Sequence, residues 1–349
     1  MRSSLNPTEA EMTWYSGIDL HSTNSVIVVS DEADRVALQR RLPNELGRIL
    51  EALEPYREQL VGVVVESTYN WYWLVDGLQD AGYRVHLANT AAIRQYDGLK
   101  HSGDTADARH LAHLLRLDIL PTGYIVPKAQ RAVRDLARKR LQLVRARTAQ
   151  VLAVENLFAR NTGSRPSANS VKRFTGEDID LLGFDADVAL ALKANVAILG
   201  ALNTEIERLE ARLLERVAPR PEFVWLKSAP GIGDILAMTI WLETGTVTRF
   251  AAVGNFSSYC RCVDSARVSN GKKKGEGNVK NGNKYLAWAF VEAANFAVRF
   301  CPQAKRFYER KKARTHAIVA LKAIAHKLAR ACYHMLREGK PFELKRCFG

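Results

Sequence analysis

The stretch SGIDLHSTNSVIVVSD, residues 16–31, decides the fold of the first part of the chain. Apolar runs lie on both sides of the polar residues 21–24, which predicts two strands joined by a hairpin turn. Asp19 stands between Ile18 and Leu20 in the first of these strands. An acid among apolar neighbours in a half-buried strand needs a reason, because a buried carboxylate is costly unless it is paired or bound.

Further secondary-structure signals follow this hairpin in a defined order. The predicted elements are a strand over 35–43, a helix over 44–60, a β-branched strand over 61–68, a helix over 71–83 that ends at Gly82, and a strand over 84–89. Three hairpin strands followed by helix, strand, helix and strand is the order of the ribonuclease H fold. We therefore predict an α/β domain over residues 1–126.

Four acids occupy positions at which a metal-dependent enzyme needs them. Asp19 lies in the first strand, Glu66 ends an apolar strand, and Asp104 and Asp107 open a predicted helix. Active groups in open α/β sheets lie at the carboxyl ends of strands, and acids three residues apart share a helix face. Hard divalent cations prefer oxygen ligands, so the set predicts a Mg²⁺ or Mn²⁺ site. Taken singly, Asp104 or Asp107 is equally well explained as a first-turn acid that complements the helix dipole.

Histidines and cysteines give no comparable pattern. His21 and His86 lie near predicted strand ends, where a histidine is more often packed or hydrogen-bonded than a ligand, and neither is assigned to the site. The five cysteines include Cys260 and Cys262, whose spacing does not match the usual zinc clamp. We expect free thiols in a reducing cytoplasm.

The middle of the chain predicts two long helices. Apolar residues recur at steps of three and four over 137–151 and again over 199–213, and the turn-rich stretch NTGSRPSANS (161–170) separates them. This pattern favours an antiparallel coiled-coil hairpin over 127–219, although two helices of a larger bundle explain it nearly as well. The stretch APRPEF (218–223) ends the second helix, and we predict a helical domain over 220–349.

Two glycine-rich segments of the last domain suit contacts with phosphate. Gly231 and Gly233 form a turn that feeds a helix, which would expose backbone N–H groups to nucleic acid, as in helix-hairpin-helix motifs; the alternative is an ordinary turn between packed helices. The stretch VDSARVSNGKKKGEGNVKNGNKYL (263–286) is a loop whose lysines attract phosphates. Local composition alone favours a solvated basic loop, since a serine hydroxyl needs activation before it is a nucleophile.

The overall charge also indicates a polyanionic partner. Lys and Arg number 51 against 37 acids, which gives a net charge of +14. A basic surface gains free energy by displacing counterions from nucleic-acid phosphates. The N-terminal residues lack the apolar core of a secretory signal, and no apolar run reaches the ~18 residues of a membrane span. We expect a cytoplasmic protein that is associated with the nucleoid when bound to DNA, with no membrane partner.

In these motifs the chain resembles the DEDD transposases of the IS110 group of insertion sequences, and within it the IS1111 subgroup. Site-specific invertases of the Piv type share the pattern. The four-acid signature is matched in order by GIDLH (17–21), VVVEST (63–68) and GDTADARHLA (103–112). SAPGIGDILA (228–237) matches the proline-glycine turn, and residues 267–294 match the serine-containing C-terminal motif. The family serine corresponds to Ser269 and not Ser265, and Asn270 stands where many members have glycine.

The resemblance implies a ribonuclease H-like domain, a coiled-coil linker and a helical transposase domain. It implies DNA strand cleavage and exchange through a 5′-phosphoserine at Ser269, with Mg²⁺ held by Asp19, Glu66, Asp104 and Asp107. We expect phosphates near the cut to be held by Lys272, Lys273, Lys274 and Lys280. The implied partners are donor and target DNA, a non-coding guide RNA (bridge or seeker RNA) that pairs with both DNAs, and further copies of the chain. These copies would form a dimer, and a tetramer in the synaptic complex, in which one subunit's acids meet another's serine.

Two other functions remain open on the residues alone. The first is a metal-dependent nuclease or junction resolvase in which water attacks and the serine loop only binds. The second is a nucleic-acid-binding scaffold without turnover, whose acids are helix caps. The three hypotheses differ in what they require of Ser269 and Asp19.

Overall fold

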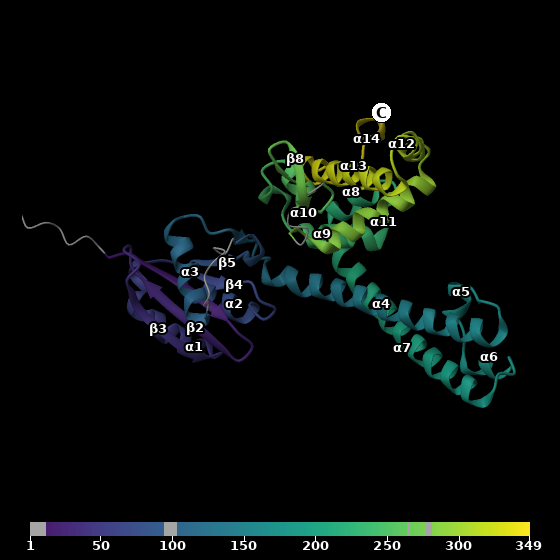
Figure 1. Cartoon of the computed structure of the whole chain (residues 1–349), viewed down its shortest axis with the longest axis horizontal. Helices are drawn as coiled ribbons and strands as arrows, with labels where there is room; N and C mark the ends of the chain where they lie inside the picture. Colours follow the sequence, from purple (N-terminus) through teal and green to yellow (C-terminus); the bar gives the residue numbers. More distant parts are fainter. Residues whose placement is uncertain (1–11, 94–102, 264–265, 277–280) are drawn as a thin grey trace, which may run out of the picture. The chain divides into compact units, whose positions relative to one another are not determined.

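The computed structural model describes residues 12–93, 103–263, 266–276 and 281–349 (Figure 1). The chain divides into two compact units, residues 1–126 and 127–349, and each is described by itself. Whether residues 127–219 form a domain separate from 220–349 stays a prediction.

The first unit is built on a mixed six-stranded sheet in the order β3-β2-β1-β4-β5-β6. Its elements are β1 (Trp14–Leu20), β2 (Asn24–Ser30), β3 (Val36–Pro43), α1 (Leu46–Leu53), the 3-10 helix η1 (Glu54–Gln59), β4 (Leu60–Glu66), α2 (Tyr72–Asp80), β5 (Val85–Ala88), η2 (Thr90–Ala92), α3 (Asp104–Arg116) and β6 (Thr122–Gly123). The strands and helices predicted over residues 16–89 are confirmed, except that the first predicted helix ends at Leu53. Pro55 explains this end, because proline lacks the N–H that a helix interior requires.

Strand pairing gives the unit its ribonuclease H-like arrangement. β1 pairs antiparallel with β2 and parallel with β4, and β4 pairs parallel with β5. The short β6 closes the far edge of the sheet, antiparallel to β5. A mixed α/β sheet of this order, followed by a helical region, fits the predicted fold.

The two faces of the sheet are covered differently. α1 and α2 cover one face, and the apolar core between them and the sheet consists of residues such as Ile18, Leu20, Ile27, Val29, Ile49, Leu53, Val63, Val65, Leu74 and Leu78. On the other face, α3 places Ala108 and Leu111 against the sheet. Alternate residues of β1 point to opposite faces, so Ile18 enters the core while Gly17 and Asp19 face α3.

Gly17 allows α3 to lie directly on β1. A Cβ atom at this position would be 2.0 Å from the carbonyl oxygen of Ala108 and 2.8 Å from the backbone nitrogen of Ala112. These atoms belong to the backbone of α3, so a side chain could be accommodated only by displacing the helix. The glycine of the GIDLH stretch therefore fixes the height of α3 above the sheet.

The second unit begins with two long helices that pair along their length (Figure 1). These are α4 (Lys128–Thr162) and α7 (Ala186–Val217), joined through α5 (Ala168–Val171) and α6 (Gly176–Asp180). Arg140 donates to Glu210 Oε1 at 2.7 Å, and Arg147 donates to Asn203 Oδ1 at 3.1 Å. The partners run in opposite directions along the sequence, so the helices are antiparallel. Coiled-coil packing between them stays a prediction.

By length and composition, α7 could also cross a membrane, with a mean hydropathy of 1.3 over its most apolar window. This is weak evidence for a span, because the core helices of soluble proteins meet the same criteria. Leu192, Val196 and Leu199 of this helix belong to a small core near the connector, together with Val154 and Phe158 of α4.

Helices make up most of the remainder of the second unit. The elements are α8 (Pro221–Lys227), α9 (Asp234–Thr244), the 3-10 helix η3 (Val247–Arg249), α10 (Val253–Tyr259), β7 (Ala266–Ser269), β8 (Lys272–Glu276), α11 (Lys284–Phe300), α12 (Pro302–Lys312), α13 (Ala317–Glu338) and α14 (Leu344–Phe348). Phe256 and Phe290 are the largest fully buried side chains of its core. All five cysteines are free thiols, as predicted, and burial raises the pKa of Cys260.

The segment expected to be a loop around Ser269 contains a β-hairpin. β7 and β8 pair antiparallel, and Ser269 pairs with Lys272 across a two-residue turn. Asn270 and Gly271 have φ values of 50° and 70°. Positive φ at both central residues is the requirement of the hairpin turn that Asn-Gly favours. Ser269 is therefore the last strand residue before a tight turn.

The contact at Gly17 gives a stability prediction. Gly17→Ala should lower the free energy of unfolding of the first unit by at least about 2 kcal/mol, because the added methyl group collides with the backbone of α3. Gly47→Ala is the matched control: nothing lies within 4 Å of a Cβ there, and alanine in α1 should stabilise by about 0.5–1 kcal/mol. Urea unfolding followed by circular dichroism measures both. Equal stabilities of the two variants would contradict the assigned role of Gly17.

Candidate active site

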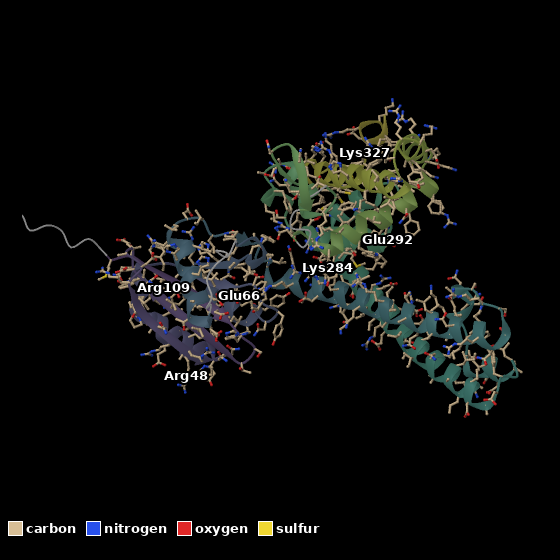
Figure 2. The ribbon with its side chains drawn as sticks, in the orientation of Figure 1. Arg48, Glu66, Arg109, Lys284, Glu292 and Lys327 are labelled. Carbon is tan, nitrogen blue, oxygen red and sulfur yellow. The ribbon has the colours of Figure 1, made fainter. Side chains whose placement is uncertain are left out.

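Asp19 and Glu66 lie side by side at the ends of two neighbouring strands. Ile18 of β1 pairs with Val65 of β4, so Asp19 and Glu66 are the next residues along two parallel strands. Asp19 is 4% exposed. Glu66, which is labelled in Figure 2, is partly buried. Burial, followed by the contact with Asp19, raises the pKa of Glu66.

The first turn of α3 brings the other two acids to the same place. α3 begins at Asp104 after the cap residue Gly103, and both Asp104 and Asp107 lie in its first turn. The negative charge of Asp107 contributes to the raised pKa of Glu66, and the charge of Asp19 contributes to the raised pKa of Asp107. All four predicted acids therefore gather where α3 crosses the carboxyl ends of β1 and β4.

His21 adds a nitrogen to this cluster. Its Nε2 atom lies 3.1 Å from Asp19 Oδ2 and 3.2 Å from Asp104 Oδ2. This nitrogen is shielded from solvent, and among the described residues it has no partner with hydrogen-bond geometry. One potential ligand atom from each of Asp19, His21 and Asp104 lies within 4.8 Å of the other two. The carboxylate oxygens of Asp19 and Asp104 and the ring nitrogen of His21 are therefore close enough to bind one metal cation.

Arg41 bonds directly to one acid of this cluster. β2 pairs Val26 with Asp19 on one side and with Arg41 of β3 on the other, so the three residues lie in one row across the sheet. Arg41 pairs with Asp104 Oδ2 and also donates to Asn24 Oδ1 at 2.6 Å. The hydrogen bond from Arg41, followed by the charge of His21, holds the pKa of Asp104 below its usual value.

The other acids of the cluster are crowded. Burial raises the pKa of Glu66 to about 7, helped by its hydrogen bond with Asp19 and by the charges of Asp19 and Asp107. Burial and the charges of Asp19 and Asp104 likewise raise the pKa of Asp107. Like charges held together favour protonation unless a cation neutralises them. Asp19, His21 and Asp104 thus form a group that could hold a divalent cation, and Glu66 and Asp107 lie near enough for the charge of Asp19 to raise their pKa values.

Ser269 belongs to the second unit, and its side chain is exposed at the tip of the β7–β8 hairpin. Lys272 and Lys274 of β8 are also exposed. The side chain of Lys273 and the whole of Lys280 lie outside the described residues, as does Ser265. The roles of Ser269 and of these lysines stay predictions.

The predicted glycine turn has a structural reason of its own. A Cβ atom on Gly231, whose φ is 82°, would be 2.2 Å from the carbonyl oxygen of Ala293 in α11. Gly233 is the N-cap of α9, and nothing lies within 4 Å of a Cβ at this position. Gly231 is thus explained by helix packing, while nucleic-acid contact by this turn stays a prediction.

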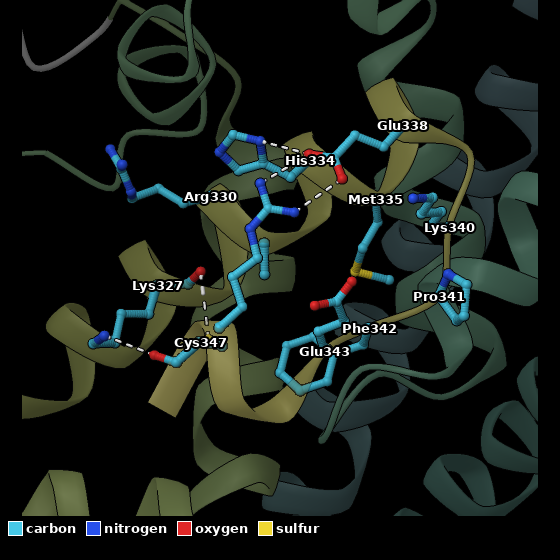
Figure 3. Close-up of a pocket in the computed structure, with 12 residues that line it drawn as sticks. Lys327, Arg330, His334, Met335, Glu338, Lys340, Pro341, Phe342, Glu343 and Cys347 are labelled. Carbon is cyan, nitrogen blue, oxygen red and sulfur yellow. Dashed lines mark hydrogen bonds and ion pairs between the residues drawn. The ribbon is translucent and has the colours of Figure 1, made fainter. Parts of the chain in front are cut away.

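A cavity of about 190 Å³ lies between α13 and the C-terminal segment (Figure 3). Arg346 donates two hydrogen bonds to Glu338, at 2.9 Å and 2.8 Å, across its rim. Lys327 donates to the carbonyl oxygen of Cys347 at 2.7 Å. These contacts hold the C-terminal segment on α13, which accounts for the cavity without a ligand.

Sequence reasoning missed two residues of the cluster, His21 and Arg41. The signal for His21 was available, since it follows the end of β1 two residues after Asp19, and residues two apart in an extended chain share one side. Arg41 depends on the register of β3 against β2, which composition does not reveal.

Comparison with known proteins gives two family matches and one curated relative. A profile described as "Transposase", and named for the DEDD transposases of IS110, matches residues 16–160. A second, described as "Transposase IS116/IS110/IS902 family", matches residues 225–309. The "Probable family 20 transposase" of Pseudomonas aeruginosa strain PAO1 is 26% identical over 277 residues, which cover 76% of this chain and 80% of that protein. The first profile spans the four acids and the second spans the Ser269 hairpin.

The raised pKa of Glu66 predicts a pH-dependent stability. Its folded-state pKa is about 7 and its ordinary value is 4.5, so the folded protein binds the extra proton between these values. The free energy of unfolding should therefore fall as the pH rises from about 4.5 through 7. Glu66→Gln should flatten this slope and be more stable than wild type at pH 8 by on the order of 1–2 kcal/mol.

Urea unfolding between pH 5 and pH 8 measures the effect. Glu51→Gln, on an exposed position of α1, is the control and should keep the wild-type slope. Addition of Mg²⁺ at pH 8 should stabilise wild type more than Glu66→Gln. Parallel slopes for wild type and Glu66→Gln would show that the carboxylates are not crowded in the folded protein.

Proposed function

Because this chain belongs to the IS110 family of transposases, we propose that it is an RNA-guided, Mg²⁺-dependent DNA recombinase that moves its own insertion sequence. In this proposal it cleaves and exchanges DNA strands through a phosphoserine at Ser269. The observation that carries the proposal is the gathering of Asp19, Glu66, Asp104 and Asp107 around one buried strand end.

The acid cluster supports metal-dependent chemistry because burial and neighbouring carboxylates raise the pKa values of Glu66 and Asp107, and a bound cation would favour their ionised forms. Asp19, Glu66, Asp104 and Asp107 would hold Mg²⁺ or Mn²⁺, with His21 adjacent to the same oxygens. A bound divalent ion there would polarise the scissile phosphate and neutralise charge that develops on it. Arg41 pairs with Asp104, and a bound ion would take over part of the neutralisation of the Asp104 charge.

Ser269 would act as the nucleophile. Its Oγ attacks the scissile phosphorus and forms a phosphoester to the 5′ end, the bond from phosphorus to the 3′ oxygen breaks, and the serine proton leaves with the new 3′-OH. A 3′-OH of another strand then attacks the phosphoserine, joins the DNA and returns a proton to the serine. Support comes from the exposed position of Ser269 at a tight turn, with the cations of Lys272 and Lys274 on the facing strand.

Nucleic acids are the proposed partners, and they match the net charge of +14. Donor and target DNA would be recognised by base pairing with a guide RNA, while the protein binds backbone and shape. A homo-oligomer, in which acids and serine come from different subunits, belongs to the same proposal. The cytoplasm is the proposed location.

A metal-dependent nuclease or junction resolvase is the principal alternative. The same acids would serve it, and water would replace Ser269 as the nucleophile. The resemblance of residues 225–309 to the second transposase profile favours the serine, because the hairpin lies inside that match. A scaffold without turnover is disfavoured by the raised pKa values of Glu66 and Asp107, which helix caps would not produce.

Covalent trapping separates these functions. Wild type incubated with cognate DNA, guide RNA and Mg²⁺ should give a protein–DNA adduct that denaturing electrophoresis resolves. Ser269→Ala should give none, and Asp19→Ala should reduce the adduct at least about 100-fold, because each removes an element of the transferring machinery. Cleavage without adduct in Ser269→Ala would establish the water-dependent alternative.

A mixing experiment tests the shared site. Ser269→Ala and Asp19→Ala proteins, each inactive alone, should recover part of the activity when combined. No recovery under conditions where both proteins bind DNA would place each acid set and serine in the same chain.

Salt dependence tests the nucleic-acid interface. Affinity for duplex DNA should fall by about 10³-fold or more between 50 and 200 mM salt if six or more phosphates are contacted. Lys272→Ala combined with Lys274→Ala should reduce the slope of log affinity against log salt by about 2. Filter binding or fluorescence anisotropy measures both, with Lys193→Ala on α7 as a control. A salt-independent affinity would contradict the polyanion interface.

A further inference from the structure

The Ser269 hairpin leaves the helical body and returns to it at two points that are bonded to each other. The chain leaves after α10 at Tyr259–Arg261 and returns before α11 at Gly282–Asn283. The Arg261 guanidinium donates to the carbonyl oxygens of Asn281 and Gly282, each at 3.0 Å. The backbone N–H of Asn283 donates to the carbonyl oxygen of Tyr259 at 2.6 Å. The base of the hairpin is therefore closed by contacts from both sides.

The return point has no room for a side chain. Gly282 has a φ of 86°, and a Cβ there would be 2.6 Å from the carbonyl oxygen of Tyr259 and 3.1 Å from that of Ser258. Arg261 also has a positive φ of 54°. The backbone at both ends of the base is thus held in conformations that few residues adopt.

Asn283 connects this base to the core. Its Oδ1 atom accepts from the backbone N–H groups of Tyr285 and Leu286, at 2.8 Å and 3.1 Å, and so caps α11. Its Nδ2 atom donates to Glu243 Oε2 at 2.7 Å, and this contact is buried. The cap fixes the direction of α11, and Glu243 fixes the amide that forms the cap.

Glu243 is in turn held by Arg138 of α4. Arg138 donates to Glu243 Oε1 and Oε2 at 2.6 Å and 2.7 Å, and its guanidinium lies 4.6 Å from the ring centroid of Tyr285. The side chain of Glu243 is 3% exposed. Burial alone would lower the pKa of Arg138, but the hydrogen bonds and charge of Glu243 raise it. Removing one partner would leave a buried charge uncompensated.

A buried ion pair is by itself weak evidence for a stabilising role. Apolar residues of similar volume often replace such a pair without loss of stability. The pair of Arg138 and Glu243 joins the base of the Ser269 hairpin to α4. α4 is the first helix of the second unit.

We propose that Arg138 and Glu243 are positioning residues for the Ser269 hairpin, acting through Asn283. The inference rests on the proposed function of Ser269, and it adds two residues that the serine motif does not contain. Neither Arg138 nor Glu243 contacts DNA in this proposal. They fix the base from which the hairpin presents its serine.

The test compares two ion pairs that share α4. Glu243→Gln removes the charge at the hairpin base, and Glu210→Gln removes it from the pair with Arg140, which joins α4 to α7. Amide hydrogen exchange over residues 283–286, where the capped N–H groups lie, should be at least about 10-fold faster in Glu243→Gln and unchanged in Glu210→Gln. The rate of adduct formation should fall at least about 10-fold in Glu243→Gln, with the DNA concentration for half-maximal rate within about 2-fold of wild type.

Two outcomes would overturn the proposal: exchange over 283–286 that is the same in both variants, or faster exchange in Glu243→Gln with an adduct rate equal to that of Glu210→Gln. Arg138→Lys keeps the positive charge but not the paired hydrogen bonds, and it should give an intermediate effect on both measurements. If Glu243→Gln does not fold, Arg138→Lys is compared with Glu210→Gln in its place. Failure of the proposed function is recognised separately, because Ser269→Ala would then still form the adduct. In that case the hydrogen-exchange data alone would decide whether Arg138 and Glu243 fix the hairpin base.

Discussion

The close approach of α3 to β1 at Gly17 is the contact on which the acid cluster depends. Because the helix backbone lies where a Cβ would be, its first turn is held directly over the carboxyl ends of β1 and β4. Asp104 and Asp107 are thereby brought to Asp19 and Glu66, from segments far apart in sequence. Their mutual repulsion follows from this geometry. Burial, followed by the charges of the neighbouring acids, raises the pKa of Glu66 and of Asp107, and a bound cation would favour their ionised forms.

The second unit solves a different problem, which is to hold an exposed serine in a defined place. An Asn-Gly turn sets the tip of the hairpin, and Arg261, Gly282 and Asn283 set its base. Glu243 and Arg138 extend that base into the core. A serine nucleophile gains little from flexibility, because it must be oriented before a metal-polarised phosphate can react. In the proposed function the two units are therefore complementary: the first supplies the carboxylates, and the second supplies the hydroxyl group of Ser269.

Much of the first unit could be predicted because its signals are local. Apolar runs on both sides of residues 21–24 give the hairpin, the β-branched run before Glu66 gives the central strand, and Asp104 and Asp107 mark the start of α3. His21 was missed because it was weighed alone and not as the same-face neighbour of Asp19. The β7–β8 hairpin was missed because lysines and glycines suggested a loop, although Asn270-Gly271 is a strong hairpin signal. The Glu243 network could not be predicted, since its partners Arg138 and Asn283 are 105 and 40 residues away.

In the proposed reaction, the acid cluster enables Ser269 to form the covalent bond to the DNA phosphate. Tandem mass spectrometry of the nuclease-digested adduct tests it most directly, because it locates the nucleotide on a single side chain. The account predicts a 5′-linked nucleotide on Ser269 when Mg²⁺ is present, and none when Mg²⁺ is chelated or when Asp19 is replaced by asparagine. A nucleotide on any other side chain, or a modified Ser269 in the absence of divalent ions, would contradict it.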